Sequence, residues 1–400
     1  MQSYEKYLRE SAVPRETLDV FLDPDTLTYV KFDAEMGYVH ANSIARNGLD
    51  NSLTISTNQK NGARTAHMYA YRPCRINTYG DSLTECSQVN DGETWQEYLA
   101  AHLGEPVRNF GVGGYGTYQA YLRMLRVEKT DAAADNVVLY LAADDHCRSV
   151  MRCRHAVICR VWDHMGGFQF HNNFWANIEM DLDAEKFVER ENLLSTPESL
   201  YKMTYPDFMV EALKDDLMVQ LNVAGSVDPK SLDLERISAL ADILGEPHLD
   251  ISGPEAVRES ATRLTDAYGF ASARRVLDLT LDFCRERGKT LMVLTMLPKA
   301  MGAVLNNKPR YDQTILDYLA DKELPHFDMI RAHFEDYQNF TGPFEEYMKR
   351  YLIGHYSPAG NHFFAFSMKD VLIEMLEPKP ITYRDDDGEA EEVFKGYVRA

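Results

Sequence analysis

The chain has 400 residues, of which 45% are hydrophobic, and it contains 23 Tyr and 18 Phe. This composition indicates a folded globular protein, and the length suggests two structural units or one domain with large insertions. The formal net charge of −20 argues against binding to nucleic acids or to anionic membranes, because such a surface repels their phosphates.

Six cysteines are too few for a disulfide framework in a chain of this size, so we expect reduced thiols. The first residues, MQSYEKYLRESAVPRE, are charged and lack the apolar segment of a secretory signal. No run of about 18 apolar residues occurs, so we expect no membrane span. Together these features predict a cytoplasmic protein.

Residues 1–72 begin with a helical pattern, and short β-branched segments punctuated by Gly, Asn and Asp follow it. This pattern predicts an N-terminal β-rich extension.

Strands and helices then alternate. Residues 75–80 and 107–111 read as short strands, 92–104 and 117–129 as amphipathic helices, and 136–145 (NVVLYLAADD) as a strand buried on both faces. Strands that alternate with helices predict a parallel sheet with helical crossovers.

The alternation stops at residue 150 and resumes at about residue 270. Residues 151–269 are predicted to be a mostly helical insertion or lid, and residues 73–150 and 270–378 to form the α/β core. Within the second core segment, 272–288 reads as a helix and 290–298 as a strand. Residues 379–400 form an acidic tail that we expect to be solvated.

One short stretch, INTYGDSLTECSQ, places Ser82 at the end of a predicted strand. Gly114, Asp144 and His355 also follow strands or lie on loops. In doubly wound sheets ligands bind beyond the carboxyl ends of the strands. A serine hydroxyl needs a general base and an oxyanion site before it can attack a carbonyl, and these positions supply candidates for both.

Four segments resemble the blocks of the GDSL, or SGNH, hydrolase family and occur in that family's order: YGDSLTE, NFGVGGYGT, VVLYLAADD and GHYSPAGNHFFA. They lie within residues 75–145 and 285–376. The motif GDSL alone is a weak signal, whereas four ordered blocks on a strand–helix pattern are specific.

The resemblance implies a flavodoxin-like three-layer α/β/α sandwich with a central parallel sheet, and ester hydrolysis without a metal or a cofactor. It makes Ser82 the nucleophile and His355 the base. The amides of Ser82 and Gly114 would bind the oxyanion, and Asp144 occupies the third oxyanion position.

The chain departs from the family pattern at two places. The third oxyanion position usually holds Asn, and an ionised Asp144 could not donate a hydrogen bond there. The Asp that usually precedes the histidine is replaced by Leu352 and Ile353. Several groups remain as candidates to orient His355: a backbone carbonyl, Asp81, Glu345 and Glu346.

Three charged residues near these blocks are candidates for substrate binding or support: Asp81, Asp145 and Arg148. Arg148 is either a substrate clamp or the salt-bridge partner of Asp145.

Two other patterns suggest different chemistry. The segment GVGGYG, residues 111–116, fits a dinucleotide-binding G-x-G-x-x-G, but Asp144 lies further on than the ~20 residues usual for that fingerprint. Cys147, Cys153 and Cys159 lie among four histidines, but their spacing matches no zinc motif. We therefore expect no cofactor and no metal site.

The sequence thus predicts a serine hydrolase that removes a small acyl group from a carbohydrate or a similar alcohol. Two alternatives stay open: a catalytically impaired binding protein on the same fold, and an O-acyltransferase that uses the same Ser and His. The expected partner is a small-molecule or carbohydrate ester, and the oligomeric state is open.

Overall fold

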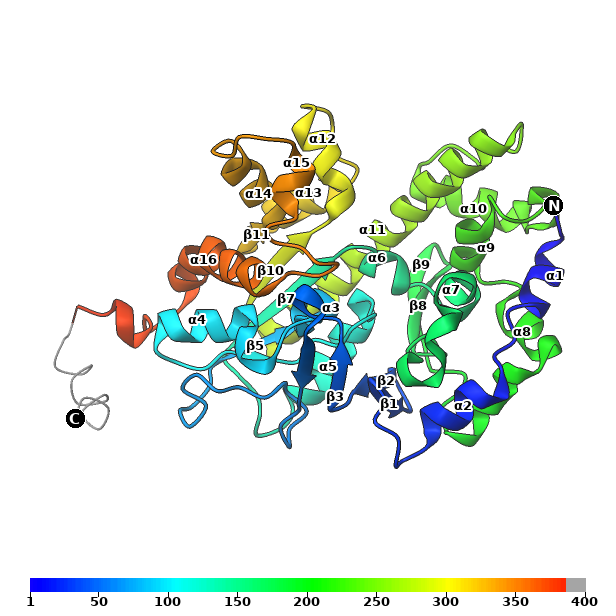
Figure 1. Cartoon of the computed structure of the whole chain (residues 1–400). Helices are drawn as coiled ribbons and strands as arrows, with labels where there is room; N and C mark the ends of the chain where they lie inside the picture. Colours follow the sequence, from blue (N-terminus) through cyan, green and yellow to red (C-terminus); the bar gives the residue numbers. More distant parts are fainter. Residues whose placement is uncertain (386–400) are drawn as a thin grey trace.

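A five-stranded parallel sheet lies at the centre of the molecule, in the order β11-β10-β7-β5-β6 (Figure 1). The computed structural model describes residues 1–385, apart from the side chains of residues 160–165. The strands are β5 (Ile76–Tyr79), β6 (Arg108–Asn109), β7 (Asn136–Ala142), β10 (Thr290–Met296) and β11 (His326–Asp328). The predicted parallel α/β core is confirmed.

The strand order reverses direction between β5 and β7. Numbered along the chain, the sheet runs 2-1-3-4-5, which is a doubly wound order. The chain moves outward from β5 to the edge strand β6, and it then returns past β5 to β7. At this switch point the carboxyl ends of β5 and β7 lie side by side, which is where doubly wound sheets bind ligands.

Helices cover both faces of this sheet (Figure 1). One layer contains α5 (Thr117–Val127) and the C-terminal half of α11 (Pro254–Glu286). The other contains α4 (Trp95–Leu103), α12 (Met301–Leu305), α14 (Met329–Tyr337) and α16 (Pro358–Met375). The core is therefore an arrangement of three layers.

The sequence of β7 explains why this strand is central. Every residue from Asn136 to Ala142 is buried. Val137, Leu139 and Leu141 pack in the core on the side of α5 and α11. Val138 and Tyr140 pack in the core on the side of α4 and α16. An uninterrupted apolar run thus serves two cores at once, as expected of a parallel strand covered on both faces.

The first 72 residues, predicted to be rich in β-structure, contain helices as well as hairpins. The helices are α1 (Tyr4–Arg9) and α2 (Arg15–Leu22). The two antiparallel pairs are β1 (Val30–Asp33) with β2 (Gly37–His40), and β3 (Ser43–Arg46) with β4 (Leu53–Ser56).

The segment between β7 and β10 is mostly helical but includes one antiparallel hairpin, β8 (Asn177–Asp181) with β9 (Lys186–Arg190). Its helices are α6 (Asp145–Arg148), α7 (His155–Trp162), α8 (Pro206–Leu213), α9 (Leu217–Val223), α10 (Leu234–Leu244) and α11. The predicted boundary at residues 269 and 270 falls inside α11, which continues without a break from the inserted segment into the core.

The remaining helices are α3 (Ser82–Glu85), α13 (Gln313–Asp321) and α15 (Phe344–Met348). Most of the predicted acidic tail, from residue 386 onward, lies outside the described residues. Within residues 1–385, no helix is both long enough and apolar enough to cross a bilayer.

Candidate active site

Ser82 lies at the switch point, where β5 ends and α3 begins. Asp81 caps this short helix, because its Oδ1 accepts a hydrogen bond from the amide of Leu83 at 2.8 Å. Gly80 precedes them, and a Cβ there would lie 2.9 Å from the backbone oxygen of Tyr140 on the neighbouring strand. Only glycine permits this approach, so the sequence Gly-Asp-Ser fixes where the hydroxyl of Ser82 lies.

His355 contacts Ser82 from the far end of the chain. Its Nε2 lies 2.9 Å from Ser82 Oγ, across 273 positions of sequence. His355 is on the loop before α16, where Ser357 caps the helix by accepting a hydrogen bond from the amide of Gly360 at 3.2 Å. The structure therefore brings together the two residues that the sequence predicted as nucleophile and base.

Gln88 orients His355, and sequence reasoning missed it. Gln88 Oε1 accepts the backbone N–H of His355 at 2.8 Å and lies 2.9 Å from its Nδ1. Gln88 Nε2 donates to the backbone oxygen of Asn47 at 2.8 Å. Gly354 makes room, because a Cβ there would lie 2.6 Å from Gln88 Oε1.

These contacts determine the tautomer of His355. A backbone N–H can only donate, so the Gln88 atom that it reaches is the carbonyl oxygen. That oxygen is an acceptor, so His355 Nδ1 carries the proton. His355 Nε2 is then unprotonated and can accept the hydrogen of Ser82 Oγ. This is the arrangement that a serine nucleophile and a general base need.

Burial of the His355 ring favours its neutral form. Burial lowers the pKa of His355, although the negative charges of Asp81 and Glu85 oppose that shift. Asp81 Oδ2 also lies 3.3 Å from Ser82 Oγ. Glu345 and Glu346, the other candidate acids, are exposed, and Glu345 pairs with Lys349 on the surface.

Residues 111–116 form a glycine-rich loop after β6, which we call the glycine loop. Gly114 lies on this loop and has a φ of +81°. A Cβ at this position would lie 2.6 Å from the His171 ring and 2.8 Å from the Tyr38 hydroxyl oxygen. Neither the amide of Gly114 nor that of Ser82 donates a hydrogen bond to any residue in the described range. Both amides are thus free to bind an oxyanion.

Tyr38 and His171 come from outside the α/β core. Tyr38 is on β2 of the N-terminal segment, and His171 is in the segment between β7 and β10. The Tyr38 hydroxyl is buried and has no hydrogen-bond partner among residues 1–385. Burial raises the pKa of Tyr38 well above its usual value, so this hydroxyl keeps its proton and can donate. Tyr38 lies in no motif, and His171 is one of the four histidines of the Cys/His segment, whose spacing did not point to this site.

Asp144 follows β7 at the switch point, where its half-exposed side chain forms ion pairs with Arg148 and Arg154. Burial alone would raise the pKa of Asp144, but the two arginines outweigh it and hold that pKa well below its usual range. An ionised carboxylate accepts hydrogen bonds and does not donate them. Asp144 therefore cannot serve as the third oxyanion donor.

Asp145 and Arg148 form an ion pair next to Asp81. Asp145 Oδ1 binds Arg148 Nη1 at 2.9 Å, and Asp145 Oδ2 accepts the amide of Ala142 at 3.0 Å. Arg148 Nη1 also lies 3.8 Å from Asp81 Oδ2 and donates to the backbone oxygen of Tyr115 at 3.1 Å. Of the two roles predicted for Arg148, the structure shows the salt bridge with Asp145.

The glycine loop packs against α3 rather than forming a phosphate cradle. A Cβ at Gly111 would lie 2.2 Å from the amide nitrogen of Glu85, and the amide of Gly113 donates to the Glu85 carboxylate at 2.7 Å. At the start of α5, the amide of Tyr118 already donates to Ser149 Oγ at 3.0 Å. These contacts leave few free backbone N–H groups to bind a pyrophosphate. The geometry therefore does not favour the dinucleotide-binding alternative.

Comparison with known proteins adds no identification. No protein-family model matches the chain, and a search of curated proteins finds no significant match.

Proposed function

We propose that the protein is a serine hydrolase that cleaves carboxylic esters through an acyl-serine intermediate. One observation carries the proposal: Ser82 Oγ lies 2.9 Å from the unprotonated nitrogen of a histidine whose other nitrogen is held by Gln88. The four sequence blocks that resemble the GDSL, or SGNH, hydrolases support the same reaction. The doubly wound sheet is compatible with the fold of that family.

In this proposal Ser82 Oγ attacks the ester carbonyl while His355 Nε2 takes its proton. The carbonyl carbon becomes tetrahedral, and its oxygen gains a negative charge. His355 then gives the proton to the departing alcohol, and the acyl group remains on Ser82. Water attacks the acyl-serine in the same way, with His355 again as the base, and releases the acid.

The free amides of Ser82 and Gly114 would donate to the oxyanion. Removing one such donor costs about 3 kcal/mol of transition-state stabilisation in other serine hydrolases. Because Asp144 is ionised, a third donor must come from elsewhere. We propose the hydroxyl of Tyr38, which is protonated, unpartnered among the described residues and close to Gly114.

The alcohol part of the substrate is proposed to be a carbohydrate or a similar polyol, and the acyl group to be small. Family resemblance is the main support. The half-exposed carboxylate of Asp144 adds a physical argument, because hydroxyl groups of a sugar could donate to it. Asp144 follows β7 and Ser82 follows β5, and these are neighbouring strands.

The test is the hydrolysis of p-nitrophenyl acetate by the wild type and by two matched variants. Ser82→Ala removes the nucleophile, whereas Ser87→Ala changes a serine just beyond α3 whose hydroxyl lies 3.5 Å from that of Tyr29 and makes no hydrogen bond to His355 in the described part of the chain. We expect turnover to vanish in Ser82→Ala and to persist in Ser87→Ala. A wild type that is inactive from pH 5 to pH 9, or equal activity in all three proteins, would contradict the proposal.

A further inference from the structure

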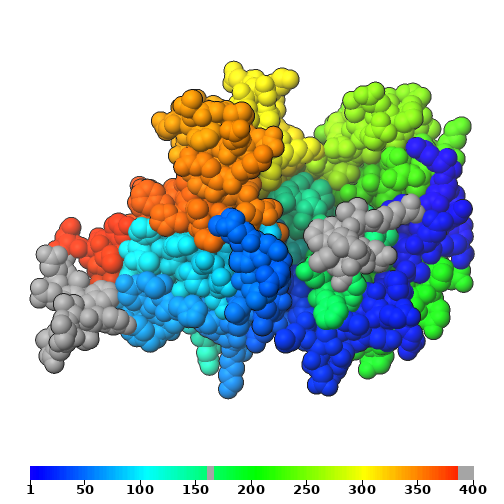
Figure 2. All heavy atoms as spheres, in the orientation of Figure 1, coloured from blue at the N-terminus to red at the C-terminus, as the bar shows by residue number. Residues whose placement is uncertain are grey.

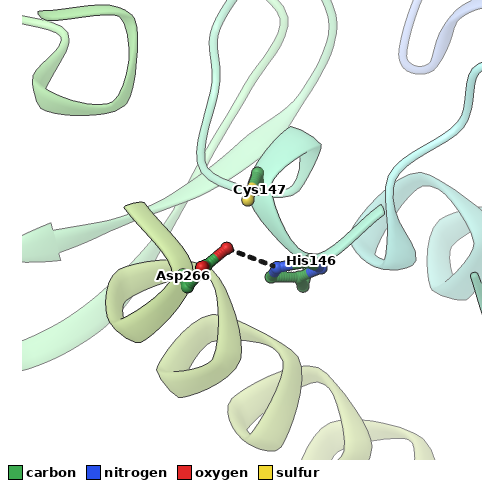
Figure 3. A group of neighbouring side chains, drawn as sticks. All are labelled: His146, Cys147 and Asp266. Carbon is green, nitrogen blue, oxygen red and sulfur yellow. Dashed lines mark ion pairs between the residues drawn. The ribbon is translucent and has the colours of Figure 1, made fainter. Parts of the chain in front are cut away.

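A second group of reactive side chains lies on α6 and α11, beyond Asp144 and Asp145. His146 and Cys147 on α6 face Asp266 on α11 (Figure 3). Each offers one donor atom, and these nitrogen, sulfur and oxygen atoms all lie within 4.8 Å of one another. The proposed hydrolysis uses none of the three.

The ring of His146 is buried, and it has no hydrogen-bond partner among the residues that the structure describes. It is 3% exposed, and neither of its ring nitrogens makes a hydrogen bond within the described part of the chain. Asp266 Oδ1 lies 3.9 Å from its Nε2, which is too far for a hydrogen bond. Burying an imidazole in this way costs free energy, and such a group in a native protein calls for an explanation.

The surroundings fix this arrangement. The His146 ring stacks on Phe270, with 4.2 Å between the ring centroids. Gly269 lets α11 approach α6, because a Cβ there would lie 2.5 Å from the His146 ring and 3.1 Å from Cys147 Sγ. The close approach of the two helices therefore depends on a glycine placed opposite the cluster.

A cavity of about 670 Å³ borders the cluster, and Asp266, Phe270 and Tyr311 contribute to its lining. Figure 2 shows a hollow between the lobe that contains α12–α15 and the lobe of α10 and α11. Solvent in this cavity reaches the edge of the cluster at Asp266, whose side chain is 19% exposed. An ion and a water ligand would thus have a route to the three side chains.

We propose that His146, Cys147 and Asp266 bind a divalent transition-metal ion of the zinc type, with a water molecule from the cavity as the fourth ligand. Imidazole, thiolate and carboxylate are the ligands that Zn²⁺ takes in proteins. Zinc-ligand bonds of about 2.0–2.3 Å place tetrahedral ligands roughly 3.3–3.8 Å apart. The 3.9 Å between His146 and Asp266 is near this range, and Cys147 needs a small shift.

Lys299 leaves the metal-facing oxygen of Asp266 available. Its Nζ pairs with Asp266 Oδ2, whereas Asp266 Oδ1 is the oxygen that faces His146. The Lys299 side chain is half-exposed, so it can move without opening the core. Metal binding would release the thiol proton of Cys147. It would also join α11 to α6, the short helix that carries Asp145 and Arg148.

The site was not predictable from motif spacing. His146 and Cys147 are neighbours in sequence, but the third ligand lies on a helix much further along the chain. The other cysteines of that segment do not join them: Cys153 Sγ donates to the backbone oxygen of Asn172 at 3.3 Å. The spacing among Cys147, Cys153 and Cys159 therefore carried no information about this cluster.

The experiment measures metal binding directly on untagged full-length protein. The protein is stripped with a chelator and titrated calorimetrically with Zn²⁺, and separately with Co²⁺ while the absorption spectrum is recorded. We expect one Zn²⁺ per chain and a thiolate-to-cobalt charge-transfer band. Cys147→Ala should abolish that band, and Asp266→Asn should weaken Zn²⁺ binding at least tenfold.

Cys284→Ala is the matched control, because it removes another buried thiol on α11 away from the cluster. It should leave both the band and the affinity unchanged. Asp266→Asn changes a partly exposed side chain, and an unaltered melting temperature of the stripped variant establishes that it folds. A wild type that binds no Zn²⁺, or Cys147→Ala and Asp266→Asn variants that bind Zn²⁺ as tightly as the wild type does, would overturn the proposal.

Discussion

Gln88 holds His355 through a single oxygen atom, which accepts the backbone N–H at 2.8 Å and the ring Nδ1–H at 2.9 Å. Serine hydrolases with a Ser-His-Asp triad have a carboxylate at this place. The oxygen of the neutral Gln88 amide also orients the ring and favours the tautomer with the proton on Nδ1. The amide carries no negative charge that could stabilise the imidazolium form of His355. Asp81 and Glu85 therefore have to supply this stabilisation through space.

The first prediction concerns Gln88. Gln88→Ala removes the acceptor for Nδ1–H, so His355 can rotate and change tautomer. We expect kcat for p-nitrophenyl acetate to fall by about a hundredfold or more, the range typical of a lost general base, with little change in KM. Gln313→Ala, which changes an exposed glutamine on α13, is the control. Equal kcat in Gln88→Ala and the wild type would show that Gln88 does not position His355.

The second prediction concerns pH. His355 must be neutral to act as a base, and burial lowers its pKa from the ordinary value of about 6.5. Activity should therefore persist as the pH falls through 6.5 and decline only when the pH passes the lower pKa of the folded protein. A pH profile of kcat/KM measures this acid limb. Gln88→Glu places a carboxylate against Nδ1, so it should move the acid limb to higher pH.

An acid limb at or above pH 6.5 in the wild type would contradict this description of the His355 environment. A limb that stays at the same pH in Gln88→Glu would contradict the contact between residues 88 and 355.

The third prediction concerns Gly114. Gly114→Ala places a Cβ against the His171 ring and the Tyr38 hydroxyl, at a φ of +81° that alanine rarely adopts. The loop must shift, so its amide leaves the oxyanion site. We expect kcat to fall by about a hundredfold. Gly302→Ala, on α12, has no atom within 4 Å of the added Cβ and should leave kcat unchanged. Wild-type kcat in Gly114→Ala would exclude this amide as an oxyanion donor.

The fourth prediction concerns the Tyr38 hydroxyl. Tyr38→Phe removes only an oxygen that has no partner within residues 1–385, so thermal stability should not fall. If this hydroxyl donates to the oxyanion, kcat should fall tenfold to a hundredfold, with ester hydrolysis as the measurement. Tyr140→Phe removes a hydroxyl that is also buried and unpartnered there, but on the side of α16. A similar kcat in both variants would exclude the role of Tyr38.

Local patterns in the sequence predict several elements of the core correctly. The buried run of β7 and the amphipathic pattern of α4, which Gly104 ends at φ +71°, lie where they were predicted. The sequence also placed Ser82 at the end of a strand and His355 on a loop, and the fold brings the two together. Such elements are predictable because apolar periodicity and glycine stops act over a few residues.

The rest of the site depends on contacts that no local pattern encodes. Gln88 reaches His355 because its own backbone is left-handed, with φ +72°, and because Gly354 leaves space for it. Tyr38 and His171 approach Gly114 from segments outside the core. The boundary predicted at residue 270 likewise has no local counterpart in the structure, because α11 runs through it from Pro254 to Glu286.

The central claim is that Ser82 is an activated nucleophile, and covalent labelling tests it most directly. The wild type would be treated with a fluorophosphonate, and the modified peptide located by mass spectrometry. We expect one adduct per chain, on Ser82, which disappears in His355→Ala because the hydroxyl then lacks its base. An unlabelled wild type, or an adduct on a different residue, would show that Ser82 is not an activated nucleophile.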